Sequence, residues 1–123
     1  MKILTVEDNE INAKLMDHML KDLDFEYEHI VAEDADRALE LTSADTFDLI
    51  LMDINLGHGQ MDGSEVMQVL KNKDEFKNTP MYAVTCYSLP GDRERFLEEG
   101  FDKYFSKPIN HASLLEAIKS EKK

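Results

Sequence analysis

The sequence contains no tryptophan, one cysteine, three prolines and five glycines among its 123 residues. Because Cys86 is alone, no internal disulfide can form, and the fold must depend on an apolar core that a chain of this length can bury. A signal-peptide pattern and any apolar run long enough to cross a bilayer are also missing. We therefore expect a cytoplasmic protein with no membrane partner. No repeat, linker or low-complexity tract interrupts the chain, which predicts one domain over residues 1–123.

Basic residues are scarce, since 14 lysines and arginines stand against 26 aspartates and glutamates, for a formal net charge of −12. Such an excess of negative charge disfavours direct binding to nucleic acid or to an anionic membrane surface. An acidic balance on a small domain usually serves solubility. We therefore expect no direct nucleic-acid partner.

What the chain does contain is a regular alternation of short apolar segments with amphipathic ones. The apolar segments, predicted as strands, are residues 3–6, 25–32, 49–52, 81–84 and 101–105. Helices are predicted at about 10–23, after Asp34, from Asp62-Gly63, up to Gly100 and after Asn110. Strict alternation of this kind predicts an α/β fold with a parallel sheet and helices on both faces.

Two local expectations accompany this pattern. In the first helix the apolar positions Ile11, Leu15, Met19 and Leu23 recur at helical spacing and predict its apolar face. Cys86, just after the fourth strand, is expected to be a buried small hydrophobe, because free cysteines usually are. The alternatives are that it crowds the site nearby or offers a thiol to oxidants.

Polar residues follow four of the predicted strands at the point where each ends. Glu7-Asp8 follows the first strand, Asp53 the third, Thr85 the fourth and Lys107 the fifth. In open parallel sheets the carboxyl ends of the strands share one edge, and ligands bind outside it. We therefore expect these side chains to meet in one crevice.

The residue types in that crevice indicate phosphoryl chemistry. Three carboxylates in close contact repel one another unless they take up protons or bind a cation, and oxygen ligands without Cys or His favour Mg²⁺. Lys107 adds a positive charge beside Asp53, and Thr85 adds a hydroxyl. Phosphoryl transfer depends on such positioning and charge neutralisation, so Asp53 is the predicted nucleophile, which would form an acyl phosphate.

These residues carry a resemblance to a known family. The motifs Val6-Glu7-Asp8-Asn9, Leu51-Met52-Asp53, Met61-Asp62-Gly63, Thr85 and Lys107-Pro108 resemble, in order and along the whole chain, the receiver domain of two-component response regulators (CheY-like). Asn9 and Asn12 further resemble receivers of phosphorelays, hybrid kinases and single-domain regulators. The resemblance implies a flavodoxin-like, doubly wound fold: a five-stranded parallel sheet of order 2-1-3-4-5 with five helices.

The resemblance also implies a magnesium site and its ligands. Asp53 matches the phosphoacceptor, and Asp8 and Asp53 match the direct ligands of Mg²⁺. Glu7 matches the acidic residue that acts through a bound water, and the backbone carbonyl of Asn55 matches the third protein ligand.

The remaining site residues follow from the same resemblance. Thr85 and Tyr104 match a switch pair, in which the hydroxyl moves toward the phosphoryl group and the aromatic ring turns inward. Lys107 matches the phosphate-binding lysine. The Lys107-Pro108 peptide bond is expected to be cis.

Three features depart from the family pattern, the first being Cys86, which stands after Thr85 where a small residue is usual. Ten residues instead of the usual eight separate Asp53 from Gly63, which predicts a longer and more mobile loop at residues 57–60 beside the site. Pro90-Gly91 leaves the start of the fourth helix open, on a face that receivers commonly use for output.

The function implied is that of a signalling domain. It would take a phosphoryl group onto Asp53 from the phosphohistidine of a histidine kinase or a histidine-phosphotransfer domain, and change its surface near the fourth helix and fifth strand. A downstream protein partner would recognise that change. Such a domain catalyses its own phosphotransfer and dephosphorylation without being a conventional enzyme, and we expect a monomer or weak dimer.

Three alternatives remain open from the residues. The first is a Mg²⁺-dependent phosphatase with Asp53 as covalent nucleophile, although such enzymes commonly place a general acid two residues later, where this chain has Asn55. The second is an interaction module that works without phosphorylation. The third is a flavin-binding protein, which Glu7-Asp8 disfavours because two carboxylates after the first strand would repel a phosphate.

Overall fold

The computed structural model describes residues 1–56, 61–86 and 89–122, so the predicted long loop at 57–60 lies outside the described residues. The strands form one sheet in the order β2-β1-β3-β4-β5, and every neighbouring pair is parallel. The strands are β1 (Lys2–Val6), β2 (Glu28–Ala32), β3 (Leu49–Asp53), β4 (Met81–Thr85) and β5 (Lys103–Ser106). The helices are α1 (Glu10–Leu20), α2 (Ala35–Ala44), α3 (Gly63–Lys71), α4 (Asp92–Glu99) and α5 (His111–Glu121). The predicted fold class and strand order are confirmed.

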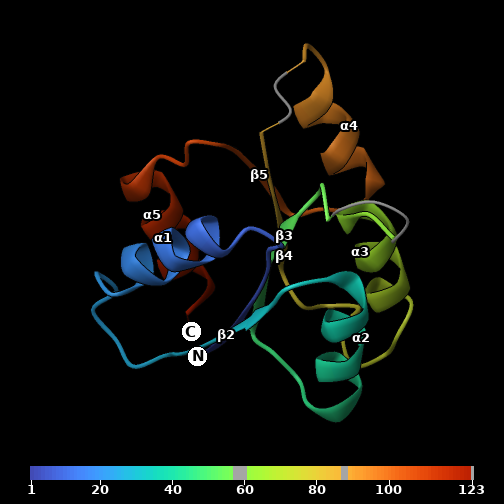
Figure 1. Ribbon diagram of the computed structural model, residues 1–123, viewed down its shortest axis with the longest axis horizontal. Coiled ribbons are helices and arrows are strands. Elements are labelled where there is room, and N and C mark those ends of the chain that lie inside the picture. Colours follow the sequence, from blue (N-terminus) through green and yellow to red (C-terminus); the bar gives the residue numbers. More distant parts are fainter. Residues whose placement is uncertain (57–60, 87–88, 123) are drawn as a thin grey trace.

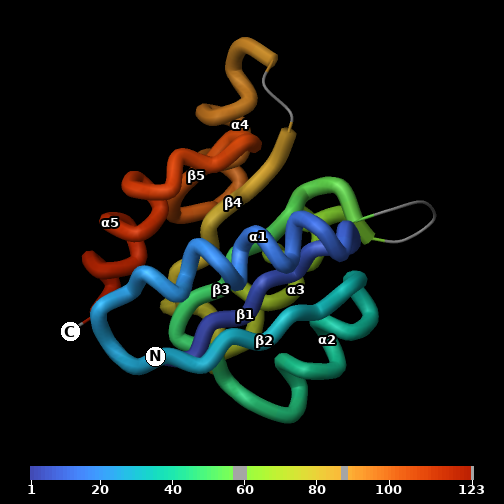
Figure 2. Tube along the Cα trace, turned by 60° about the vertical axis from the view of Figure 1, so that its left-hand side comes forward, coloured from blue at the N-terminus to red at the C-terminus, as the bar shows by residue number. Residues whose placement is uncertain are grey.

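The helices cover both faces of this sheet. Helices α1 and α5 lie together on one face, and α2, α3 and α4 lie on the other (Figure 1). Both chain ends lie at the end of the sheet where the strands begin, and Met1 and Lys122 line one cavity there (Figures 1 and 2). Among the helices in the described ranges, none combines the length and apolar character needed to cross a lipid bilayer.

The three central strands are buried on both faces, which explains their largely apolar sequences. Every residue of β3 and β4 is buried. Because side chains alternate along a strand, each central strand contributes to two core clusters. The cluster under α1 and α5 contains Ile3, Leu49, Leu51 and Tyr82, and the cluster under the other three helices contains Leu4, Ile50, Met52 and Ala83.

The helix starts follow local side-chain chemistry. Asn9, Asp34, Asp62 and Asn110 each accept a hydrogen bond from the backbone N–H three residues later, as the sequence predicted. The exception is α4, which begins after Gly91 without a side-chain cap; Gly91 has a φ of 88°.

Two strands begin later than predicted. Strand β2 starts at Glu28 because its partner β1 starts only at Lys2, so residues 25–27 have no strand beside them. Strand β5 starts at Lys103 because the two residues before it are used elsewhere. Phe101 N–H closes α4 through Phe96 O at 3.2 Å, and Asp102 N–H binds Met81 O at 2.8 Å.

The expected apolar face of α1 is wrong for its first half. Ile11 is 70% exposed and Leu15 is 54% exposed, whereas Met16 and Leu20 face the core. The helix carries two apolar stripes, and only the one that faces β1 and β3 is covered. Sequence periodicity alone does not distinguish them.

The expectation for Cys86 is also wrong, since the residue is exposed. It directly follows Thr85, the last residue of β4, and therefore lies beyond the part of the strand that the helices cover.

Candidate functional site

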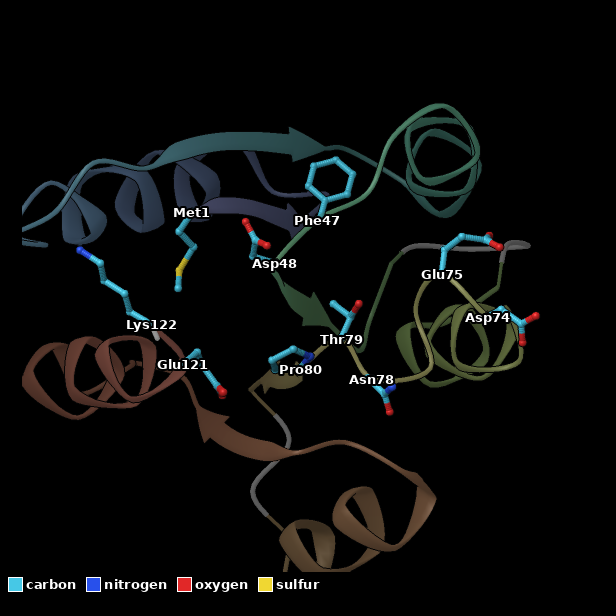
Figure 3. A pocket seen from close by; sticks show the side chains of 10 residues that line it. All are labelled: Met1, Phe47, Asp48, Asp74, Glu75, Asn78, Thr79, Pro80, Glu121 and Lys122. Carbon is cyan, nitrogen blue, oxygen red and sulfur yellow. The ribbon is translucent and has the colours of Figure 1, made fainter.

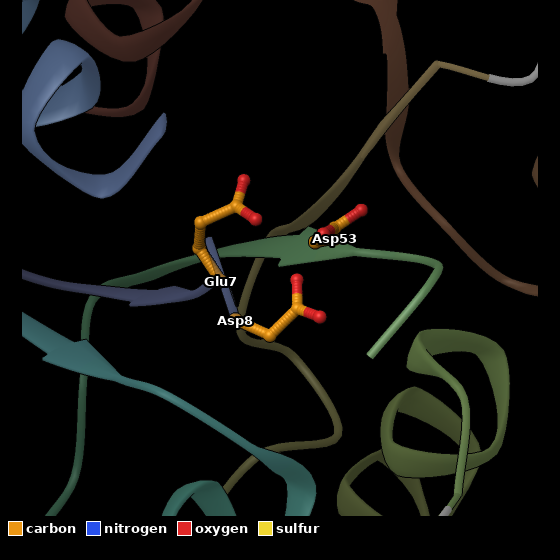
Figure 4. Close-up of side chains that lie close together, drawn as sticks. All are labelled: Glu7, Asp8 and Asp53. Atoms are coloured by element: carbon orange, nitrogen blue, oxygen red, sulfur yellow. The ribbon is translucent and has the colours of Figure 1, made fainter. Parts of the chain in front are cut away.

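The site lies at the edge of the sheet where the strands end. Asp53 is the last residue of β3 and Thr85 is the last residue of β4, while Glu7 and Lys107 each directly follow a strand. Figure 4 shows the side chains of Glu7 and Asp8, which follow β1, close to that of Asp53 at the end of β3. The ends of β1, β3 and β5 therefore bring three carboxylates and one ammonium group together, and Thr85 ends the strand that lies between β3 and β5.

The three carboxylates are close enough to share one cation. Glu7, Asp8 and Asp53 each offer an oxygen within 4.8 Å of the other two. Glu7 and Asp53 are buried, whereas Asp8 is exposed, so the cluster opens toward solvent on the side of Asp8. A group of ligands that are all oxygens and that is open to solvent on one side suits Mg²⁺, because this ion keeps several of its bound waters. The residues present therefore fit this ion.

Lys107 partly neutralises the cluster. Its Nζ lies 2.8 Å from Glu7 Oε1 and 3.6 Å from Asp53 Oδ2. Burial opposes the charged ammonium, but the hydrogen bond to Glu7 and the charge of Asp53 outweigh it and raise the pKa of Lys107. The lysine therefore stays charged, and it is closer to Glu7 than to the predicted nucleophile.

Asp53 holds a proton far more tightly than an ordinary aspartate. Burial, followed by the neighbouring Glu7, raises the pKa of Asp53 to about 7, against the opposing effects of Lys107 and the Asn55 N–H. Without a cation, the carboxyl group is therefore close to half protonated at neutral pH. A divalent cation would favour the ionised form.

Gly63 allows α3 to start immediately beside Asp53. Its N–H donates to Ile54 O at 2.8 Å, and a Cβ at this position would lie 2.2 Å from the backbone oxygen of Asp53. Only glycine permits this approach. Asp62 and Glu65 complete a reciprocal cap on the same turn, which fixes the helix start behind the site.

The other predicted site residues lie at or near this edge. Asn55 N–H donates to Asp53 Oδ1 at 3.3 Å, and Thr85 is fully buried. The Lys107–Pro108 peptide bond is cis. Tyr104 pairs in register with Ala83, two residues before Thr85, and its ring packs on Phe96 of α4 rather than among the carboxylates.

A surface that the sequence did not indicate borders the site. A cavity of about 570 Å³ lies between α1 and the segment after β5, with apolar walls that include Leu15, Met19 and Ile109. Glu7 and Lys107 line the same cavity, so it is continuous with the carboxylate cluster. The second apolar stripe of α1 was the one available sequence signal.

A larger cavity, of about 670 Å³, lies at the opposite end of the sheet (Figure 3). Asp48, Asp74, Glu75, Pro80 and Glu121 are among its lining residues, and none of the predicted site residues is. Its side chains come from segments before the strands and from the end of α5. The larger of these two cavities therefore does not coincide with the candidate site.

Comparison with known proteins identifies the family of this chain. The family model of the response regulator receiver domain matches residues 3–119 of this chain. The chain belongs to this family. Receiver domains are signalling domains of two-component systems, which agrees with the predicted class and with the strand-end constellation of acidic residues and lysine.

Relatives of this receiver domain cover nearly its whole length. The polar-differentiation response regulator DivK of Brucella anthropi is 40% identical over 118 residues, which are 96% of this chain and 93% of that protein. Chemotaxis protein CheY4 of Vibrio cholerae has a TM-score of 0.84 at 26% identity, with 98% of each chain covered. The receiver domain of sensor histidine kinase PA1611 from Pseudomonas aeruginosa has a TM-score of 0.83 at 30% identity, covering 97% of this chain and 94% of that one. That structure has a magnesium ion coordinated in its active-site cleft.

Proposed function

We propose that this receiver domain accepts a phosphoryl group on Asp53 from a phosphohistidine and passes the signal to a protein partner. The observation that carries the proposal is the grouping of three carboxylates within 4.8 Å with the ammonium of Lys107, which lies 3.6 Å from Asp53. The arrangement supplies a nucleophile, a cation site and a fixed positive charge, which are what phosphoryl transfer requires.

In the transfer step, an ionised carboxylate oxygen of Asp53 bonds to phosphorus while the phosphorus–nitrogen bond of the phosphohistidine breaks. The electron pair of that bond leaves with the imidazole nitrogen, and an acyl phosphate forms on Asp53. Lys107, released from its contact with Glu7, would hold a phosphoryl oxygen. Mg²⁺ held by Glu7, Asp8, Asp53 and the carbonyl of Asn55 would supply neutralisation of the phosphoryl charge. Attack of water on phosphorus would later release inorganic phosphate and restore the carboxylate.

The histidine kinase or phosphotransfer domain would dock on α1 and the segment after β5. Ile11 and Leu15 present exposed apolar surface there, and the adjacent cavity leads directly to Glu7 and Lys107. Residues 1–28, which include this helix, carry eight aspartates and glutamates against three lysines. We therefore expect a partner with an apolar ridge flanked by basic side chains.

Intact mass after incubation with Mg²⁺ and acetyl phosphate tests the proposal. The unaltered protein should gain one phosphate, and Asp53→Asn should gain none. Asp74→Asn, the same chemical change at an exposed carboxylate of the opposite sheet end, is the matched control and should gain one phosphate. An adduct that persists in Asp53→Asn would move the acceptor elsewhere.

The same samples distinguish the alternative functions. Rapid multiple-turnover release of phosphate from small phosphomonoesters would support the phosphatase, although Asn55 does not provide its general acid. Failure of the unaltered protein both to form an adduct and to bind Mg²⁺ would favour an interaction module that works without phosphorylation.

A further inference from the structure

Helices α3 and α4 lie on the same face of the sheet (Figure 1), and a cavity of about 410 Å³ lies between the start of α3 and α4. Four residues of α4 line it, at positions three or four residues apart: Asp92, Arg95, Phe96 and Glu99. Such positions share one side of a helix, so α4 presents a single stripe to this cavity. The hollow that α4 shares with β5 and α5 is a different one, and Arg93 lines it.

One carboxylate oxygen on this stripe has no partner. Glu99 is half-buried, and its Oε1 is fully buried. Among the buried side-chain nitrogen and oxygen atoms of the described residues, Glu99 Oε1 is the one that makes no hydrogen bond. Buried polar atoms are nearly always paired in native proteins, because an unpaired one costs free energy. Glu99 Oε1 is therefore an acceptor that a donor from outside the chain can satisfy.

The other carboxylate of the stripe is only partly satisfied. Asp92 is 7% exposed, and its Oδ2 accepts a hydrogen bond from Leu89 N–H at 3.0 Å. Its Oδ1 lies 3.8 Å from Arg95 Nη2, which is too far for a hydrogen bond. The guanidinium of Arg95 lies over the ring of Phe96 instead, 4.4 Å from its centroid. Asp92 Oδ1 is thus a second acceptor beside the same cavity.

The charges around the cavity favour a cation. Asp62, Asp92 and Glu99 line it, and Arg95 is the one basic side chain among its described lining residues. Glu99 also lines a second hollow, of about 500 Å³, on its other side. Two lysines line that hollow and would repel a cation there. A cation that reaches Glu99 is therefore favoured on the side that faces Asp92.

Apolar side chains favour a protein as the source of this cation. Leu56 and Phe96 are buried beside the cavity, whereas Leu89, which also lines it, is 71% exposed. An exposed leucine next to anionic oxygens matches a segment in which a basic residue stands beside an apolar one. A guanidinium suits this place better than an ammonium, because its N–H donors form a planar fork and its face stacks on aromatic rings.

We propose that the cavity between α3 and α4 binds an arginine side chain of a protein partner. The guanidinium donates to Glu99 Oε1 and Asp92 Oδ1, and an apolar neighbour of the arginine covers Leu89. Asn55, two residues after Asp53, lines the same cavity, so the partner also contacts the segment that follows the phosphoacceptor. The inference goes beyond the proposed function, because both carboxylates are in place without phosphorylation.

NMR titration of the backbone amides with the peptide acetyl-Leu-Arg-amide, in EDTA and without a phosphodonor, tests this binding. We expect saturable shifts of the amide signals of Asp92 and Glu99. The same peptide with citrulline, the neutral isostere of arginine, should bind roughly ten- to a hundredfold more weakly, because it cannot form hydrogen bonds assisted by charge. Glu99→Gln should weaken binding of the arginine peptide by a similar factor. Glu98→Gln, the same change at an exposed carboxylate of the same helix, should leave binding unchanged.

A third variant tests the role of charge. Arg95→Gln removes the competing cation from the cavity lining and should tighten binding of the arginine peptide. Unchanged amide signals of the strands in each variant show that the fold is intact.

Three results would overturn the site: no saturable shifts, equal binding of the citrulline peptide, or equal losses in Glu98→Gln and Glu99→Gln. Spermidine distinguishes the source of the cation. If this small polyamine binds the same amides as tightly as the arginine peptide does, the cavity is a site for free cations and the protein partner is overturned. Failure of Asp53 to accept phosphate would overturn the proposed function and leave this inference standing.

Discussion

Replacing Asp53 with asparagine should stabilise the metal-free protein, and more at pH 8 than at pH 5. The amide keeps the shape of the protonated carboxyl group but cannot ionise. In the folded protein, burial and then Glu7 raise the pKa of Asp53 from 3.8 to about 7. Between these values the folded state retains a proton that the unfolded state releases. The stability from this proton is fully present below about pH 4 and is lost as the pH rises through about 7.

The size of the effect follows from the same two values. Proton linkage for one carboxyl group with pKa values of 3.8 unfolded and about 7 folded removes roughly 2 to 3 kcal/mol of folding free energy between pH 5 and pH 8. Because asparagine cannot ionise, the free energy of unfolding of Asp53→Asn lacks this dependence on pH. Its gain in stability over the unaltered protein should therefore grow by that amount across the interval.

Urea unfolding in EDTA at the two pH values measures the gain. Asp8→Asn is the matched control, because Asp8 belongs to the same carboxylate cluster but is exposed. Saturating Mg²⁺ should reduce the advantage of Asp53→Asn, since the cation binds the ionised carboxylate. An advantage of equal size at pH 5 and pH 8 would refute the buried, proton-holding state of Asp53.

Four further substitutions test the helix start behind the site and the packing of the fold, each by urea unfolding at pH 7. Gly63→Ala should cost about 1 to 3 kcal/mol or more, because its Cβ would lie 2.2 Å from the Asp53 oxygen. Gly91→Ala meets no atom within 4 Å and should cost only about 1 kcal/mol, from its positive φ; equal losses would contradict the close approach at Gly63. Asp62→Ala should cost about 1 kcal/mol through its lost cap, and an unchanged midpoint would show that α3 does not need it. Tyr82→Phe should cost about 1 to 2 kcal/mol, because the hydroxyl of this buried ring bonds the last turn of α5; no loss would mean that water replaces this bond.

The order of the elements was predictable because it depends on local patterns. Four helix caps follow from one side chain and the backbone three residues later, and the buried strands follow from unbroken apolar runs. The strand limits were less predictable. The sequence predicted that Asp102 belongs to the fifth strand. Its N–H donates to Met81 O instead, and β5 begins at the next residue, Lys103.

The exposed side of α1 shows the same limit on sequence reasoning. Ile11 and Leu15 repeat at helical spacing as well as Met16 and Leu20 do, and only the packing of the sheet determines which stripe is buried. Cys86 is exposed, unlike most free cysteines, because it lies one position past the end of β4.

The sequence by itself determined the parallel α/β architecture and the polar residues at the edge where the strands end, since a parallel sheet brings all its strand ends together whatever the details of packing. It also determined the family, because the motifs stand in order along the chain. Only the tertiary structure decided that Lys107 binds Glu7, 100 positions away, more closely than Asp53. It likewise decided that Asp53 holds a proton near neutral pH and that Phe96 stacks on Tyr104. These properties depend on burial and on distances between remote residues, and local sequence encodes neither.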